Sequence, residues 1–217
     1  MSTDGLGDIA EAAREHFNAK HRAREQALPL CREAVRFSAN AIRCVHRGEF
    51  GPAEELIARA AANLKQAEEA LSEHRSVFYA GFVHDAQKEY AEAATTLAII
   101  AGRPLPTPDD LGVMVASYLN GIGETIGELR RHLLDSLRGG DVSHCEDVLA
   151  AMGDIYDALV TMDYPEAITS GLRRTTDAMR GILERTRGDF TMAAVQRDLE
   201  RRLEEFGKER RDSAPAD

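Results

Sequence analysis

The stretch YLNGIGETIGELRRHLLDSLRGGD, residues 118–141, carries the clearest helical pattern in this chain of 217 residues. Its apolar side chains recur every three or four positions, which is the period of a helix that is buried along one side. With the residues just before the stretch they form one apolar arc, made of Met114, Tyr118, Ile122, Ile126, Leu129 and Leu133. Two consecutive glycines, Gly139 and Gly140, end the pattern. The sequence therefore predicts a long amphipathic helix over residues 109–138.

The rest of the chain also has helical periodicity, and no segment alternates in the manner of a β-strand. Proline and glycine separate the periodic segments, as expected at helix ends. We expect helices over residues 8–47 with a bend at Pro29, 52–74, 77–100, 109–138, 141–162, 165–187 with a break near Gly171, and 188–206. These segments predict an all-α, single-domain bundle of seven helices over residues 1–206, followed by a flexible tail over residues 207–217.

Composition excludes several classes of protein. Apolar residues make up 43% of the chain and charged residues 29%, which is typical of a globular protein. No run of 18 or more apolar residues occurs, and the polar N-terminus lacks the apolar core of a signal peptide, so we expect no membrane segment. Cys31, Cys44 and Cys145 lie far apart without a CxxC motif, which argues against a zinc site or a disulfide framework and predicts a reduced, cytoplasmic protein.

The net charge of −10 argues against binding of duplex nucleic acid by electrostatic attraction alone. Of the 27 basic residues, however, only four are lysine. Arginine suits two-pronged contacts to phosphate, and it occurs here in close pairs. These pairs are Arg43/Arg47, Arg130/Arg131, Arg173/Arg174 and Arg185/Arg187. They indicate either phosphate-binding positions or a general compositional bias toward arginine.

Two pairs of glutamates have helical spacing. Glu89 and Glu92 lie three residues apart, and Glu124 and Glu128 lie four apart, so each pair shares one face of its helix. Glu89 and Glu128 fall at the edges of their apolar arcs. If the two pairs face each other, they form a pocket of four carboxylates that needs a cation; if they do not, they are solvated surface residues.

The sequence lacks the motifs of di-iron sites and of the common nucleotide-binding loops. A di-iron bundle needs Glu-x-x-His on two helices, and no histidine here has a glutamate three residues before it. Neither a Walker phosphate loop nor GxGxxG occurs. Aromatic residues make up only 6% of the chain, with no tryptophan, so stacking on bases would depend on a few tyrosines and phenylalanines.

Several segments together resemble the translin superfamily, which includes translin and TRAX. Residues 118–141 resemble the family's Tyr-Leu-x-Gly start followed by Gly-Glu-Leu-x-Arg. Supporting segments are IRCVHRGEF at 42–50, FYAGFVHDAQKEYAEA at 78–93 and MDYPEAITSGLRRTTDAMRGILERTRGDF at 162–190. The resemblance covers about residues 24–206 and implies the family's seven-helix bundle.

The acidic positions resemble those of TRAX, the nuclease member. Glu89, Tyr90 and Glu92 match its Glu-Tyr-x-Glu motif, and Glu124 and Glu128 occupy the positions of its second acidic pair. Glutamate at 124 departs from the family's aspartate and is one methylene longer. The resemblance implies that all four glutamates bind Mg²⁺ or Mn²⁺ and act in catalysis.

Three functions remain open on this reading. The first is a metal-dependent endoribonuclease on single-stranded RNA, with backbone contacts from Arg32, Arg43, Arg47, Arg130 and Arg131. The second is a non-catalytic protein that binds single-stranded RNA or DNA in an oligomeric shell, and the third is a plain helical scaffold. Family members form octamers, so the resemblance implies a homo-oligomer; a dimer is the alternative.

Overall fold

The computed structural model describes the backbone of residues 3–212 and the side chains of residues 3–208. Within these residues the chain forms helices and no strands, which confirms the all-α prediction. Six helices are long: α1 (Leu6–His46), α2 (Phe50–Ala70), α4 (Phe82–Ile100), α6 (Val115–Arg138), α7 (Cys145–Val160) and α9 (Leu172–Asp212). Three are single turns: α3 (Arg75–Phe78), α5 (Pro108–Leu111) and α8 (Glu166–Thr169).

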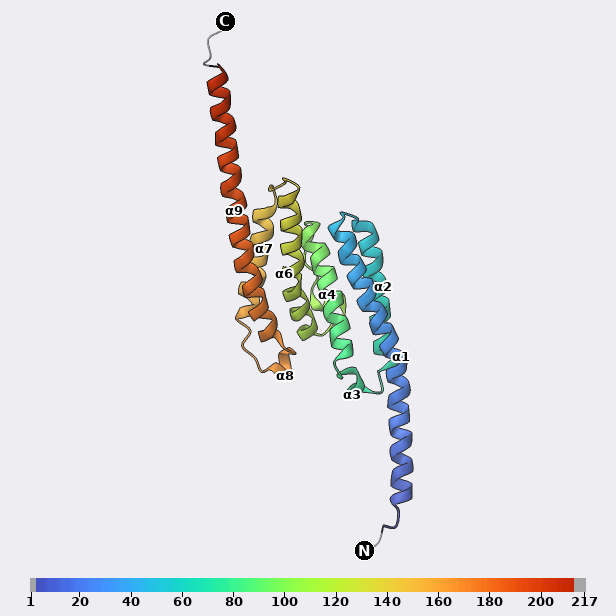
Figure 1. Ribbon diagram of the computed structural model, residues 1–217. Coiled ribbons are helices and arrows are strands. Elements are labelled where there is room, and N and C mark those ends of the chain that lie inside the picture. Colours follow the sequence, from blue (N-terminus) through green and yellow to red (C-terminus); the bar gives the residue numbers. More distant parts are fainter. Residues whose placement is uncertain (1–2, 213–217) are drawn as a thin grey trace.

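The helices α1, α4, α6 and α9 lie side by side in that order and run in the same direction (Figure 1). The helices α2 and α7 return in the opposite direction, α2 against α1 and α7 against α6 and α9. The first part of α1 and the last part of α9 extend beyond the bundle at opposite ends. None of the helices in residues 3–212 combines the length and the apolar character that crossing a bilayer requires.

The helix α4 is the centre of the bundle. Every residue from Tyr90 to Ala98 is buried, because the helix has neighbours on nearly all sides. On one side Tyr90 packs in a core with residues of α1 and α2 such as Phe37 and Leu64. On the other side Ala91 joins the core of α6, α7 and α9. The small alanines and threonines of α4 allow these neighbours to come close.

Two glycines of α6 make its contacts with the helices on either side. A Cβ atom on Gly121 would lie 2.5 Å from the carbonyl oxygen of Lys88 and 2.8 Å from Cβ of Ala91, both on α4. A Cβ atom on Gly123 would lie 2.6 Å from a methyl group of Thr175 on α9. Real Cβ atoms essentially never come this close, so the helix spacing observed here requires glycine at both positions. Next to Gly121, the hydroxyl groups of Thr95 and Thr125 form a buried hydrogen bond of 2.7 Å between α4 and α6.

Two of the expected helices are each divided in the structure. The segment 77–100 is interrupted after α3, because Gly81 has a φ of 98° that a helix does not allow, and α4 begins at Phe82. In the segment 109–138, Thr107 caps the single turn α5 as part of a capping box, and Gly112 in the left-handed conformation ends it. The long helix α6 therefore begins only at Val115.

The boundaries after α6 also differ from expectation. Asp141 does not begin α7; its carboxylate accepts hydrogen bonds from the amide and hydroxyl of Ser143, and α7 begins at Cys145. The expected break near Gly171 is present, with Ser170 and Gly171 both at positive φ.

The two segments expected at 165–187 and 188–206 form one helix after that break. The helix α9 runs from Leu172 to Asp212 without interruption at Gly188, since a single glycine does not break a helix. Residues 207–212 of the predicted flexible tail are helical, and residues 213–217 lie outside the described part. The helix α1 likewise continues through Pro29.

Replacing Gly121 tests the contact between α4 and α6. We expect Gly121→Ala to lower the free energy of unfolding by about 1–3 kcal/mol, because the added methyl group meets a backbone oxygen that cannot move aside. Gly127→Ala is the matched control on the same helix, since its Cβ would meet no described atom within 4 Å outside the backbone of α6. The free energy of unfolding of that control should rise by up to about 1 kcal/mol, because alanine has a higher helix propensity than glycine. Denaturant unfolding of both variants measures the difference, and equal effects would contradict the proposed close contact.

Candidate metal centre between α4 and α6

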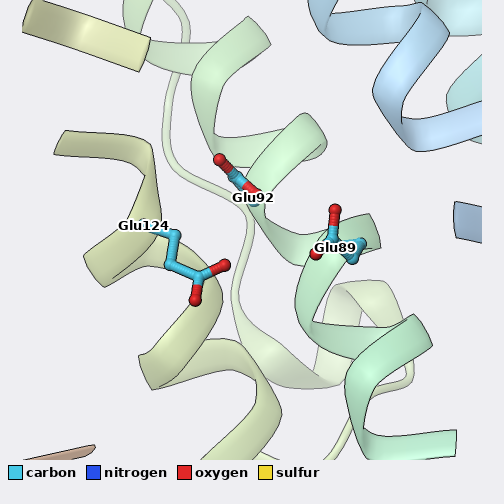
Figure 2. Close-up of side chains that lie close together, drawn as sticks. All are labelled: Glu89, Glu92 and Glu124. Carbon is cyan, nitrogen blue, oxygen red and sulfur yellow. The ribbon is translucent and has the colours of Figure 1, made fainter. Parts of the chain in front are cut away.

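Three of the four predicted glutamates come together where α4 faces α6. Glu89 and Glu92 lie one turn apart on α4, and Glu124 lies across from them on α6 (Figure 2). Each offers a carboxylate oxygen, and these three atoms lie within 4.8 Å of one another. The carboxylates therefore face one another across the two helices rather than pointing separately into water.

Glu92 is the most deeply placed of the three. It is only 9% exposed, because it lies within the fully buried part of α4. Burial is the main cause that raises its pKa to about 8, and the neighbouring charges of Glu89, Glu124 and Glu128 act in the same direction. Burial also raises the pKa of Glu89, with the charge of Glu124 adding to the effect. Near neutral pH Glu92 is therefore mostly protonated, and a cation held by this group would favour its charged form.

Lys88 is the basic residue at this group, and the sequence analysis missed it. Its ammonium nitrogen lies 2.8 Å from Oε1 of Glu124 and 3.8 Å from Oε1 of Glu89. Burial works against the charged ammonium, but the hydrogen bond to Glu124 and the surrounding acids outweigh it and raise the pKa of Lys88. Lys88 precedes Glu89 and lies four residues before Glu92, so helical spacing could have indicated its position.

Glu128 lies one turn further along α6 and has a different partner. Its Oε2 is 2.5 Å from Nε2 of His46, the last residue of α1, and this hydrogen bond lowers the pKa of Glu128. The side chain of His46 is 6% exposed, and its other ring nitrogen has no hydrogen-bond partner among the described residues. The structure thus does not include Glu128 in the group of three, and its role as a metal ligand stays a prediction. His46 and Glu128 are 82 residues apart, so no sequence spacing could have indicated the pair.

The predicted arginines fall into two groups. Arg131 lies 4.0 Å from the carboxylate of Glu128 and remains exposed. Arg32 and Arg43 are exposed on α1, and Arg47 is exposed at its C-terminal cap; Arg43 and Arg47 lie within one turn of His46.

Arg130 points away from the acids. Its guanidinium donates to the hydroxyl of Thr186 at 3.0 Å and pairs with Asp189 at 2.7 Å, so it joins α6 to α9. Arg130 therefore makes a contact between α6 and α9, and its role in nucleic-acid binding stays a prediction.

The donor set at this site fits a hard divalent cation. Three carboxylates offer only oxygen ligands, as Mg²⁺ and Mn²⁺ prefer, and Mg²⁺ sites with few carboxylates leave room for water. Burial raises the pKa of Glu92, and a divalent cation at this position would favour its charged form. Glu89, Glu92 and Glu124 are therefore the residues that could hold such an ion.

Comparison with known proteins gives relatives over most of the chain. The uncharacterized protein MJ0175 of Methanocaldococcus jannaschii is 30% identical over 176 residues, which span 79% of this chain and 76% of that protein. The structure of AfC3PO in complex with duplex RNA is 34% identical, with a TM-score of 0.80, and the match covers 87% of this chain and 98% of that one. A crystal structure of AfC3PO matches over the same shares at 32% identity, also with a TM-score of 0.80. No protein-family model matches the chain.

A more distant structure has the same fold. The structure of apo-NeC3PO is 19% identical, with a TM-score of 0.74 over 89% of this chain and 99% of that one. At this identity the likeness concerns the fold alone, and it agrees with the translin-type bundle predicted from the sequence. Taken with the closer AfC3PO matches, it shows that the chain belongs to the translin superfamily.

Proposed function

We propose that the protein is a metal-dependent endoribonuclease that cleaves single-stranded RNA by phosphodiester hydrolysis. The observation that carries this proposal is the meeting of Glu89, Glu92 and Glu124 within 4.8 Å, with Glu92 buried and its pKa raised. Perturbed carboxylates of this kind are concentrated at functional sites. The similarity to AfC3PO, a protein whose structure is described in complex with duplex RNA, supports RNA as the class of substrate.

In this proposal the three glutamates hold Mg²⁺ or Mn²⁺. Such a cation, when bound, favours ionisation of a water molecule and offsets the charge that develops on the phosphate oxygens. Glu92 supplies a ligand that is fixed by burial, while Glu89 and Glu124 approach from the two helices. Lys88 lies beside them, and its ammonium would be free to contact a phosphate oxygen if Glu124 held a cation instead.

The basic residues near Glu128 extend the site toward the RNA backbone. Arg131 is exposed beside Glu128, and Arg43 and Arg47 flank His46 on the surface of α1. Arginine in such positions contacts phosphate oxygens in pairs of hydrogen bonds. Arg32 lies about 20 Å before His46 along α1, where it suits a more distant phosphate.

We further propose that the protein acts as a homo-oligomer. Five apolar side chains form an exposed stripe at spacings of three and four on the C-terminal half of α9: Met192, Val195, Leu199, Leu203 and Phe206. Leu6, Ile9 and Phe17 form a shorter exposed row on the extension of α1. Apolar rows of this kind are typical of helices that pack against a partner, and an octamer of the family type is one assembly that they support.

Substitution of the acids tests catalysis. Glu89→Gln and Glu92→Gln should each lower the rate of single-stranded RNA cleavage by at least about a hundredfold in Mg²⁺ or Mn²⁺, because each removes one charged ligand. Glu68→Gln, at an exposed position of α2, is the control and should leave the rate unchanged. Cleavage in EDTA, or full activity of both site variants, would show that the proposal is wrong. RNA binding that weakens with salt but never yields product would favour the non-catalytic alternative.

The pH dependence of stability tests the need for a cation without measuring activity. The pKa of Glu92 is raised from 4.5 to about 8, so its favourable contribution is present at low pH and is lost as the pH rises through about 8. In EDTA, the Tm of the wild type should fall more between about pH 6 and about pH 9 than the Tm of Glu92→Gln. Mn²⁺ should restore the Tm of the wild type at the higher pH and leave the Tm of the variant unchanged. Equal pH profiles for both proteins would contradict this account of Glu92.

The stripe on α9 can be tested separately. Leu199→Glu combined with Leu203→Glu should reduce the mass of the assembly measured by light scattering, because two charges enter an apolar contact. Glu200→Lys on the same part of α9 is the control for a surface charge change and should keep the assembly mass. An unchanged mass for the double variant would show that this stripe is not a subunit contact.

A further inference from the structure

A groove made of two adjoining hollows lies between the carboxylates and the end of the bundle where α3 and α8 lie. Its upper part runs over α6 between α4 and α9 and is lined by Lys88, Glu124 and Arg174. Its lower part is lined by Tyr79, Met114, Ala116 and Ile168, among others. His84 and Ser170 line both parts, so the two hollows adjoin each other.

The chemistry changes along this groove. The upper part contains the ammonium of Lys88 and the guanidinium of Arg174, close to the acids of the candidate metal centre. In the middle, His84 shares a hydrogen bond of 2.7 Å with Ser117, and burial lowers its pKa, so this stretch is polar without a fixed positive charge. The lower part is mostly apolar, with the large exposed side chains of Tyr79 and Ile168. A charged end next to an apolar end matches a nucleotide, which has a phosphate at one end and a flat base at the other.

Tyr79 is held in an orientation that leaves its ring available. Its hydroxyl accepts a hydrogen bond of 2.9 Å from Arg75, and its ring meets the ring of Phe78 edge to face with centroids 5.2 Å apart. The guanidinium of Arg75 lies 5.2 Å from the centroid of the Tyr79 ring. The tyrosine nevertheless remains 61% exposed. A ring fixed on one side and open on the other stacks on a base with little loss of side-chain freedom.

We infer that the lower groove is a nucleobase subsite, in which an unpaired base of the substrate stacks on Tyr79. The phosphate of the same strand lies toward Lys88 and Arg174, next to the carboxylates. Bases in a duplex are already stacked and paired, so this subsite selects single-stranded over duplex RNA. The inference rests on the proposed function and adds the part of the site that distinguishes the two forms of RNA.

The subsite can be tested by fluorescence with RNA that contains 2-aminopurine, an adenine analogue whose emission falls when it stacks. In EDTA, which prevents the proposed cleavage, the analogue should be quenched at one position of a single-stranded RNA and not at the others. Tyr79→Ala should abolish that quenching and weaken binding of single-stranded RNA roughly 5- to 150-fold, while Tyr79→Phe keeps both. Binding of duplex RNA should change little in either variant. Leu105→Ala, at an exposed apolar position that lines neither part of the groove, is the control and should behave as the wild type.

The outcomes separate this inference from the proposed function. If Tyr79→Ala keeps the quenching and the affinity while the wild type cleaves RNA, the subsite is wrong and the proposed function stands. If the wild type binds no RNA, the proposed function itself fails. If Tyr79→Ala changes the mass of the assembly but not the quenching, a second copy of the chain occupies the groove and the inference is overturned.

Discussion

The close contact between α4 and α6 at Gly121 is the constraint on which the rest of the structure depends. Without a side chain at this position, the backbone of α6 lies directly against the carbonyl of Lys88 and the amide of Glu92. The helix α4 contributes to the core that it shares with α1 and α2 and also to the core that α6 shares with α7 and α9. Gly121 and the hydrogen bond between Thr95 and Thr125 therefore join the two halves of the bundle.

The same contact accounts for the chemistry of the candidate site. Because α4 is enclosed on nearly all sides, Glu92 is buried although it lies outside the main apolar arc of its helix. Because α6 lies so close, Glu124 reaches the two acids of α4. The unusual pKa of Glu92 is thus a consequence of helix packing, and the packing in turn follows from a glycine one turn before Glu124 and Thr125. Further along α6, Gly123 allows an equally close contact with α9, and it also lines the groove.

Local patterns in the sequence were sufficient for the fold class and for most of the long helices. The apolar arc from Tyr118 to Leu133 gave α6 correctly, since it depends only on spacing along one helix. The predicted positions of helix ends were less accurate where a single residue decides them. Gly81 divides one expected helix, whereas Gly188 does not interrupt α9. A glycine alone does not reveal whether the chain uses its freedom to adopt positive φ.

The candidate site was predictable to the extent that it follows helical spacing and family resemblance. These two sources gave Glu89, Glu92 and Glu124, which the structure brings together. They could not give the pairing of Glu128 with His46, because it joins residues from α6 and α1 across the bundle. They also could not separate Arg130, which contacts α9, from Arg131 beside it, because adjacent residues on a helix point in directions that only the packing distinguishes.

Lys88 supplies a positive charge to the group of acids from within the chain itself. Its ammonium partly neutralises Glu124 and Glu89 where α4 and α6 meet. The bundle therefore carries a counter-charge of its own, in contrast to small domains whose folding waits for their metal. A built-in counter-ion of this kind lets the scaffold assemble without drawing on the cell's supply of divalent ions.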